Sequence, residues 1–202
     1  MLAIALATVL IGDVRTDLAD ELVLRVRTDP FVTLVAGGAS VGVDVAHRDG
    51  LTRVSAAAFV VEVPRLLLPL VVRSDVALPA LSVVEHAVQF GLMTSLSPQH
   101  RGVFVGPELY AYRLRYVDEA NPTRAATAYE LYAHMTAGFT WFPFDNDDND
   151  KDVDVLGAVF VMPWVTVGLP VFGSGGITFN DGVFVADRLL NFHATVSIGL
   201  EL

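Results

Sequence analysis

Hydrophobic and polar residues alternate one by one along most of this chain. In TAYELYAHMTAGFTWFPF, residues 127–144, every second residue from Tyr129 is apolar or aromatic, and the residues between them are mostly small or polar. The C-terminal stretch FHATVSIGLEL, residues 192–202, alternates in the same way. A two-residue period is the pattern of a β-strand with two unlike faces, and it differs from the 3.6-residue period of a helix. The pattern therefore predicts an all-β protein.

Eight segments of the chain carry this alternation. They lie near residues 25–36, 40–48, 51–64, 84–97, 102–117, 125–142, 154–171 and 190–202. The parity of the apolar positions changes across residues 37–39, so a turn or bulge is expected there. Several segments are longer than the roughly five or six residues of an ordinary strand, and long enough for the roughly 9–11 residues that cross a bilayer. Eight is the smallest usual strand number of a closed outer-membrane barrel.

Composition places the apolar side of these strands on the outside. Of the 202 residues 53% are hydrophobic and only 18% are charged, against roughly 45–50% and about 25% in soluble domains. Lysine occurs only at Lys151, and the polar sides of the strands are rich in Gly, Ser, Thr, Ala and Tyr. Such side chains can fill the inside of a narrow barrel. We therefore expect residues 23–202 to form one domain, an eight-stranded antiparallel up-and-down transmembrane β-barrel with a polar, side-chain-filled lumen.

The N-terminus and the net charge limit the alternatives. The chain has no run of roughly 20 apolar residues, so the sequence does not predict a membrane-spanning helix. MLAIALATVLIG at the N-terminus has the length of a signal-peptide core but lacks a basic segment before it. Residues 1–22 are expected to be a signal-peptide remnant or an N-terminal extension, with a buried N-terminal strand or helix as the alternative. A net charge of −10 argues against nucleic acid as a partner, and the lack of cysteine excludes disulfides.

Charged and histidine side chains on the inward parity predict a polar network in the lumen. Basic residues come on the early strands and acidic residues on the later ones. Closure of the barrel brings the last strand beside the first, so opposite charges can pair across the lumen. The predicted members are Arg25, Arg27, Asp29, Asp44, Arg53, Glu85, Glu108, Glu130, His134, His193 and Glu201. Such a network would plug the barrel.

The outward parity carries candidate contacts with the membrane interface. Tyr129 and Trp141 share one apolar strand face. At about 3.3 Å per residue and a tilt near 40°, they are roughly 30 Å apart along the membrane normal, as two interfacial girdles would be. Arg113 and Arg115 fall on the outward parity near Tyr112 and Tyr116. They are either anchors that reach lipid phosphates or ordinary charges close to a loop.

Two short motifs could carry chemistry. DNDDNDKDVD, residues 145–154, places Asp145, Asp147 and Asn149 as an EF-hand does, but Asp150 and Leu156 stand where glycine and glutamate are needed. We expect a solvated acidic turn, with a weak surface site for a hard cation as the alternative, and neither a resident metal nor a cofactor. GSGG, residues 173–176, lacks the lysine and the helix of a phosphate loop and predicts a flexible loop.

Histidines on the polar faces raise the possibility of a lipid hydrolase. His193 shares a face with Ser197, and His134 shares a face with Glu130. A hydrolase needs its nucleophile within about 3 Å of a base, and a lipid hydrolase needs that nucleophile where lipid can reach it. A packed lumen does not provide this, so no catalysis is expected.

A resemblance to a known family lies in the segment RGVFVGPELYAYRLRY, in AHMTAGFTWFPF and the long strand that follows it after a short turn, and in the alternating C-terminal strand. In these segments the chain resembles the small eight-stranded outer-membrane proteins of the OmpA/OmpX type. The resemblance covers about residues 25–202, although such barrels commonly end in an aromatic residue and this chain ends in Leu202. It implies a monomer in the bacterial outer membrane, with outer-membrane lipid and the outer-membrane insertion machinery as its partners.

The resemblance also implies an orientation. HRDG, SPQHRG and FDNDDNDKD become periplasmic turns, and the connections 65–83, 118–124 and 172–189 become outer loops. The 65–83 connection is unusually apolar, so it is expected to lie against the rim or to extend the sheet. The expected function is a structural or surface-interaction role through the outer loops. The alternatives are a soluble or periplasmic barrel that binds an apolar ligand, a lipid-modifying enzyme, and a narrow porin-like channel.

Overall fold

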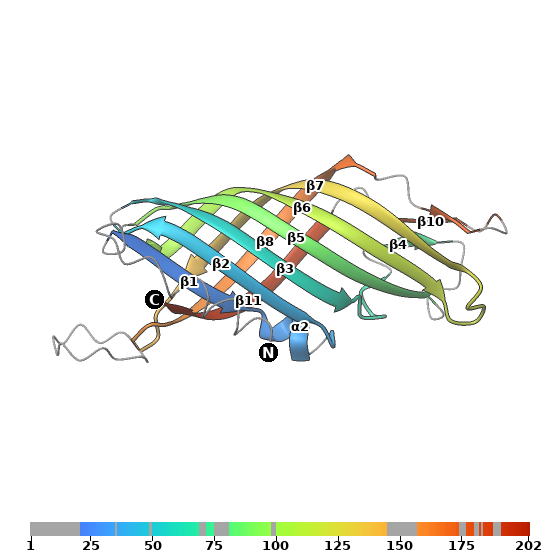
Figure 1. The fold of residues 1–202 in the computed structure, drawn as a ribbon, viewed down its shortest axis with the longest axis horizontal. Helices are drawn as coiled ribbons and strands as arrows, with labels where there is room; N and C mark the ends of the chain where they lie inside the picture. Colours follow the sequence, from blue (N-terminus) through green and yellow to red (C-terminus); the bar gives the residue numbers. More distant parts are fainter. Residues whose placement is uncertain are drawn as a thin grey trace, which may run out of the picture.

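Eight antiparallel strands close into a ring in the computed structural model, which describes residues 21–34, 36–48, 50–68, 72–74, 81–97, 100–144, 157–173, 177–179, 182, 184–187 and 191–202 (Figure 1). The order around the ring is β1-β11-β8-β7-β6-β5-β3-β2. The strands are β1 (Leu22–Thr28), β2 (Ala39–His47), β3 (Thr52–Glu62), β5 (Leu81–Ser95), β6 (Gly102–Asp118), β7 (Ala125–Thr140), β8 (Val159–Phe172) and β11 (Asn191–Glu201). The prediction of an all-β fold with eight antiparallel strands is confirmed.

The two ends of the barrel differ. The short connections 48–51 and 96–101 and the C-terminus lie at one end, here called the terminus end. The other end, the loop end, carries α2 (Pro30–Leu34), β4 (Val72–Ser74), β9 (Ile177–Thr178) and β10 (Phe184–Asp187). In Figure 1 the C-terminus and the labels of β4 and β10 lie at opposite ends of the long axis.

The two faces of the barrel wall have the polarity that the alternation predicts. Along β6 the even-numbered residues from Phe104 to Asp118 are buried, and the odd-numbered residues from Val103 to Arg115 are exposed. Large apolar side chains on the outside include Phe90, which is 61% exposed, and Met135, which is 57% exposed. Charged side chains such as Arg53 and Glu108 are buried inside. This polarity is the inverse of that of a soluble barrel with an apolar core.

The first predicted strand, 25–36, is wrong in its second half, because β1 ends at Thr28 and α2 follows. The Asp29 carboxylate accepts hydrogen bonds from the backbone N–H groups of Phe31 (2.9 Å) and Val32 (3.2 Å), and Pro30 occupies the first helical position. A capping aspartate followed by proline favours a helix start over a strand. The predicted turn at residues 37–39 is present, with Gly37 at a positive φ of 62°.

The apolar connection 65–83 is not a free loop. Leu68 and Leu81 are fully buried, and β5 begins at Leu81, three residues before the predicted start. β4 pairs with β10, which also pairs with β9, in a three-stranded sheet outside the ring. Two of the predicted outer loops, 65–83 and 172–189, therefore associate with each other.

Several predictions fall wholly or partly outside the described residues. These are the acidic segment 145–154, positions 174–176 of the glycine-rich segment, and the start of the 154–171 strand, whose described part is β8. Residues 1–20 of the predicted leader also lie outside the described residues, whereas Leu22 is already the first residue of β1. Within the described ranges, no helix has both the length and the apolar character needed to span a membrane.

Candidate functional site

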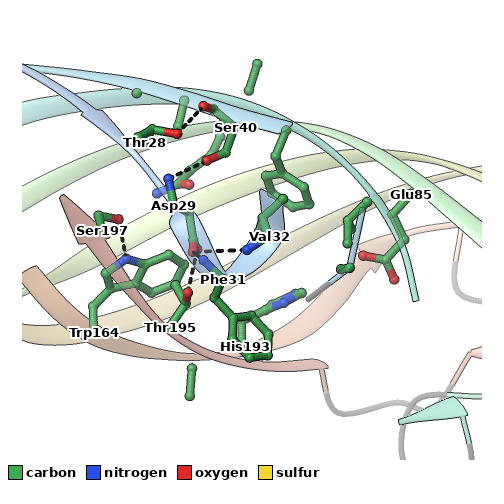
Figure 2. Close-up of a pocket in the computed structure, with 18 of the residues that line it drawn as sticks. Thr28, Asp29, Phe31, Val32, Ser40, Glu85, Trp164, His193, Thr195 and Ser197 are labelled. Carbon is green, nitrogen blue, oxygen red and sulfur yellow. Dashed lines mark hydrogen bonds between the residues drawn. The ribbon is translucent and has the colours of Figure 1, made fainter. Parts of the chain in front are cut away.

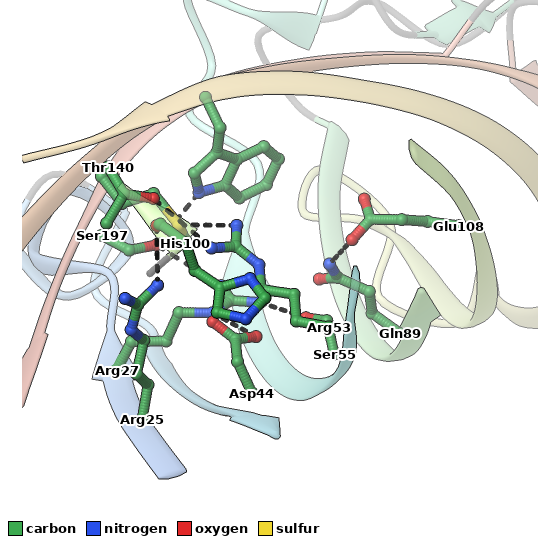
Figure 3. Close-up of polar contacts among 12 residues, drawn as sticks. Arg25, Arg27, Asp44, Arg53, Ser55, Gln89, His100, Glu108, Thr140 and Ser197 are labelled. Atoms are coloured by element: carbon green, nitrogen blue, oxygen red, sulfur yellow. Dashed lines mark hydrogen bonds and ion pairs between the residues drawn. The ribbon is translucent and has the colours of Figure 1, made fainter. Parts of the chain in front are cut away.

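The lumen at the terminus end holds a charged layer that joins the first and last strands (Figure 3). Arg25 on β1 donates from Nε to Glu201 Oε2 on β11 at 2.8 Å, and its Nη2 lies 2.7 Å from the same oxygen. Its Nη1 donates to the carbonyl oxygen of His100 at 3.1 Å. The guanidinium lies 5.2 Å from the ring centroid of Phe142 and 5.5 Å from that of Phe160. Arg25 therefore links the seam of the barrel, a turn and two aromatic rings.

Arg27 and Asp44 extend this layer across β1 and β2. Arg27 Nε lies 3.5 Å from Asp44 Oδ1, and its Nη2 donates to Ser55 Oγ at 3.0 Å. A longer contact of 3.5 Å reaches Ser197 Oγ. The buried Arg27 guanidinium thus has hydroxyl partners in addition to Asp44, which a buried ion pair needs.

Arg53 occupies the lumen beside this group with mainly apolar surroundings. Its guanidinium lies 4.2 Å from the ring centroid of Phe104, and it contacts Thr140 Oγ1 and Met162 Sδ, each at 3.4 Å. Cation–π contact of this kind is stronger where water is excluded. The two arginines with the largest fully buried side chains, Arg25 and Arg53, each face aromatic rings.

Glu108 sits in the middle of the lumen and is bound by uncharged donors. Tyr110 OH donates to Glu108 Oε2 at 3.1 Å, and the Gln89 amide and the Thr136 hydroxyl also donate to its carboxylate. The charge pattern predicts that acidic groups on later strands pair with arginines across the lumen. Arg25 and Glu201 do so, whereas Glu108 is held by hydrogen bonds from Gln89, Tyr110 and Thr136.

Beyond Glu108 lies a layer of aromatic rings and histidines. Tyr112 OH and His193 Nε2 are 2.9 Å apart, and His134 Nδ1 and Thr166 Oγ1 are 3.1 Å apart. The rings of Tyr110 and His134 are in contact, with centroids 4.3 Å apart and planes tilted by 38°. On the loop-end side of this layer lies an apolar cluster. It contains Leu68, Leu81 and their neighbours together with the same tyrosines. Charged, aromatic and apolar layers therefore follow one another along the lumen.

The structure places the predicted network members on inward positions. Glu85 and Glu130 lie on this face at the loop half, Glu130 opposite Tyr112 in the β6–β7 register. The sequence analysis did not single out the neutral partners Ser55, Gln89 and Tyr110. They share the inward parity of the charged residues, and that parity is the signal that could have found them.

The hydrolase alternative required a hydroxyl paired with a base where lipid can reach it. Ser197 accepts hydrogen bonds from Trp164 Nε1 (3.0 Å) and Arg27, neither of which is a base. His134 does contact a hydroxyl, but the Thr166 side chain is fully buried inside the barrel. Neither arrangement presents an activated nucleophile at the outer surface. Among the described residues no cluster of three or more His, Cys, Asp and Glu side chains is placed to bind a metal ion.

A cavity of about 430 Å³ opens from the lumen at the loop end (Figure 2). Its inner part is lined by Arg27, Gln89, Tyr110, His193 and Ser197. The remaining lining is largely apolar and includes Phe31 and Val32 of α2. Asp29 lies at one side, where it accepts a hydrogen bond of 2.5 Å from Thr195 Oγ1 and its backbone N–H donates to Ser40 Oγ at 2.6 Å. The volume falls in the range of small-molecule pockets, roughly 300–1,000 Å³.

The predicted interface residues lie on the outer surface. Tyr129 is 63% exposed and Trp141 is 56% exposed, near opposite ends of the β7 face. Arg113 is exposed and lies opposite Tyr129 in the β6–β7 register, and Arg115 is exposed opposite Thr127. The outward facing of all four agrees with the pattern in the sequence.

His100 was not predicted as a site residue, because it lies in a turn and not on a strand. It is buried, has a positive φ of 55°, and its Nε2 lies 2.9 Å from the carbonyl oxygen of His47. Burial lowers the pKa of His100, and the charges of Arg25 and Arg53 act in the same direction. The His47 carbonyl and Glu201 oppose the shift.

Comparison with known proteins yields no match, either to a protein-family model or to a curated protein.

Proposed function

We propose that this protein is an integral β-barrel of the bacterial outer membrane, with a sealed lumen and a structural or surface-interaction role. One observation carries the proposal. The exposed side of the barrel is largely apolar along its strands, while charged side chains such as Arg25, Arg53 and Glu108 are buried inside. An exposed apolar surface of this extent is unfavourable in water and matches the hydrocarbon core of a bilayer.

The interface residues support the same environment. Tyr129 and Trp141, near opposite ends of one outward strand face, suit the two aromatic girdles of a membrane barrel. Arg113 and Arg115 lie beside Tyr129 near the loop end of β6, where their guanidinium groups can reach lipid phosphates. The loop end would then face outward, with the β4-β10-β9 sheet as the surface for interaction partners.

The layered lumen supports a barrel that does not conduct. The Arg25–Glu201 pair, the Arg53–Phe104 contact and the Leu68 cluster occupy successive levels of the interior. A water-filled pore would leave its charged side chains hydrated, whereas Arg25 and Arg53 are buried, Arg25 against Glu201 and Arg53 against Phe104. We propose a monomer without catalytic activity, and its resemblance to OmpA/OmpX-type barrels is part of this proposal.

The location can be tested by fractionating cells that express the full chain. The proposal expects the protein in the outer-membrane fraction, resistant to washing with urea or alkaline carbonate and released only by detergent. Recovery of folded protein in the periplasmic extract, without detergent, would favour the soluble barrel that binds an apolar ligand.

A further inference from the structure

Among the residues that the structure describes, the wall of the barrel is incomplete at the loop end, between β11 and β2. β1 pairs with β11 only from Arg25 to Thr28, opposite residues 198–201. Within the described residues, no strand pairs with residues 191–197 of β11 on the side away from β8. At about 3.4 Å per residue this leaves roughly 20 Å of strand edge without a neighbouring strand.

α2 covers only part of this edge. The helix contacts both β11 and β2, but its five residues extend about 7 Å at about 1.5 Å per residue. Its Phe31 and Leu34 side chains are exposed, Leu34 to 83%. Asp29 joins the two sides of the opening through Thr195 and Ser40. The opening is thus bridged at one point and partly covered by an apolar helix.

The cavity passes through this opening. Its lining includes inward residues such as Gln89 and Tyr110 and outward residues such as Val41 and Ala194. Residues from the two faces of the wall can border one cavity at its rim or where the wall is interrupted, and this lining follows the part of β11 that β1 does not pair with, including Phe192 and Ser197. The outward side chains nearest to the edge, Phe192, Ala194 and Val196, are apolar and exposed. The opening therefore lies at the level of the apolar outer surface.

We propose that this opening admits an acyl chain of a membrane lipid sideways from the bilayer into the cavity. The inference rests on the membrane location proposed above. A largely apolar cavity stays dry and takes an apolar guest. The free edge of β11 adds a second requirement, since backbone N–H and C=O groups facing pure hydrocarbon are costly. An amphiphile satisfies both requirements, with its alkyl chain against Phe59 and Val61 and its ester or amide group at the strand edge beside Thr195.

Trp164 provides a direct probe, because it lines the cavity and the chain has two tryptophans. The Trp141→Phe variant of the full chain is folded into phosphatidylcholine vesicles whose acyl chains are either brominated or unbrominated. Bromine quenches tryptophan fluorescence only on contact. Trp164 also borders a groove on the outer surface with Ala137 and Gly138, so quenching alone does not locate the lipid.

A substitution that fills the cavity distinguishes lipid inside the cavity from lipid in the outer groove. Ala57 points inward, lines the cavity and lies opposite Gly42 and Gln89. The inference expects quenching of Trp164 in brominated vesicles and its loss in Ala57→Phe. Ala111→Phe, on the outward side of β6, is the matched control and should keep the quenching. If Ala57→Phe does not fold, Ala57→Leu fills less of the same space.

Either of two outcomes overturns the inference: no quenching of Trp164, or quenching that the Ala57 variants leave unchanged. Flotation of each sample with its vesicles separates these results from failure of the proposed location. Protein that does not float contradicts both proposals. Protein that floats without cavity-dependent quenching contradicts only the acyl-chain site.

Discussion

Arg25, on the first strand of the barrel, is bound to Glu201, on the last, across 176 positions of the chain. The pair lies at the β1–β11 seam, where Arg25 and Glu201 are also opposite each other in the backbone register. Arg25 is buried, and the side chain of Glu201 is 32% exposed. The ion pair therefore stabilises the closure of the barrel and can be tested as such.

Glu201→Gln should lower the free energy of unfolding by about 1–3 kcal/mol, because it leaves the buried Arg25 guanidinium without its charged partner. The measurement is urea unfolding in detergent micelles, followed by tryptophan fluorescence. Glu119→Gln is a suitable control, since it removes the partner of Arg65 in a pair whose members are both exposed. Such a surface pair contributes about 0–1 kcal/mol. Equal effects of the two substitutions would contradict a role of the seam pair in closure.

Met135→Arg places a charge on the outer face of β7. If that face meets lipid, the substitution should cost about 2–4 kcal/mol for protein folded in bilayer vesicles, depending on depth. Ala120→Arg places the same charge on an exposed residue between β6 and β7 and should cost little. A soluble barrel would tolerate both substitutions, so a negligible effect of Met135→Arg would count against the lipid-facing surface.

The filled lumen predicts electrical silence. Purified protein inserted into a planar bilayer should show no stepwise conductance, because the proposed sealed lumen carries charged, aromatic and apolar side chains at successive levels. Insertion is verified by protease protection of the same bilayer preparation. Discrete, reproducible channel steps from the native chain would support the porin-like alternative and refute the sealed barrel.

His100 predicts a pH dependence of stability with a defined sign. Its pKa in the folded protein lies below the ordinary value of about 6.5, so the unfolded chain takes up a proton at a higher pH than the folded chain does. The contribution of His100 should therefore lower stability as pH falls below about 6.5 and should vanish above that range. Unfolding measured between pH 5 and pH 8 tests this, about the range in which histidine titrates.

Replacement of His100 by asparagine isolates this contribution. Asparagine tolerates the positive φ of this turn and does not titrate, so His100→Asn should give a flatter stability profile than the native chain. His86→Asn, which replaces an exposed histidine on the outside of β5, is the matched control for loss of a histidine. Parallel profiles for His100→Asn and the native chain would exclude His100 as the titrating group.

Alternation predicted most of the strands, and composition was needed to place their apolar side outward. The two faces of this barrel meet opposite environments, so each strand carries a strict period of two, as the exposed and buried residues of β6 show. Arg113 and Tyr129 could be placed on the outside for the same reason. The partners within the lumen could not be assigned, because parity gives the face of a residue but not its height or its neighbour. Glu108, which is bound by Gln89 rather than by an arginine, is the example.

The sequence pattern did not predict α2 or the lateral opening. At this point of the chain, the residues that favour a helix start compete with the strand alternation. Val32, Leu34 and Ala36 continue the apolar alternation of the first strand, whereas Asp29 and Pro30 favour a helix start. The capping hydrogen bonds of Asp29 outweigh the alternation. The missing half of β1 then creates the opening between β11 and β2, a consequence of tertiary pairing that no single segment reveals.

The most direct test of the account is refolding of urea-denatured protein with and without lipid vesicles, followed by flotation and by electrophoresis of unboiled and boiled samples. The account predicts that the protein folds and floats only with vesicles, and that its unboiled band migrates differently from its boiled band. Folded protein that remains in buffer without lipid, with no heat-dependent shift, would contradict the membrane barrel and reverse the environments assigned to its two faces.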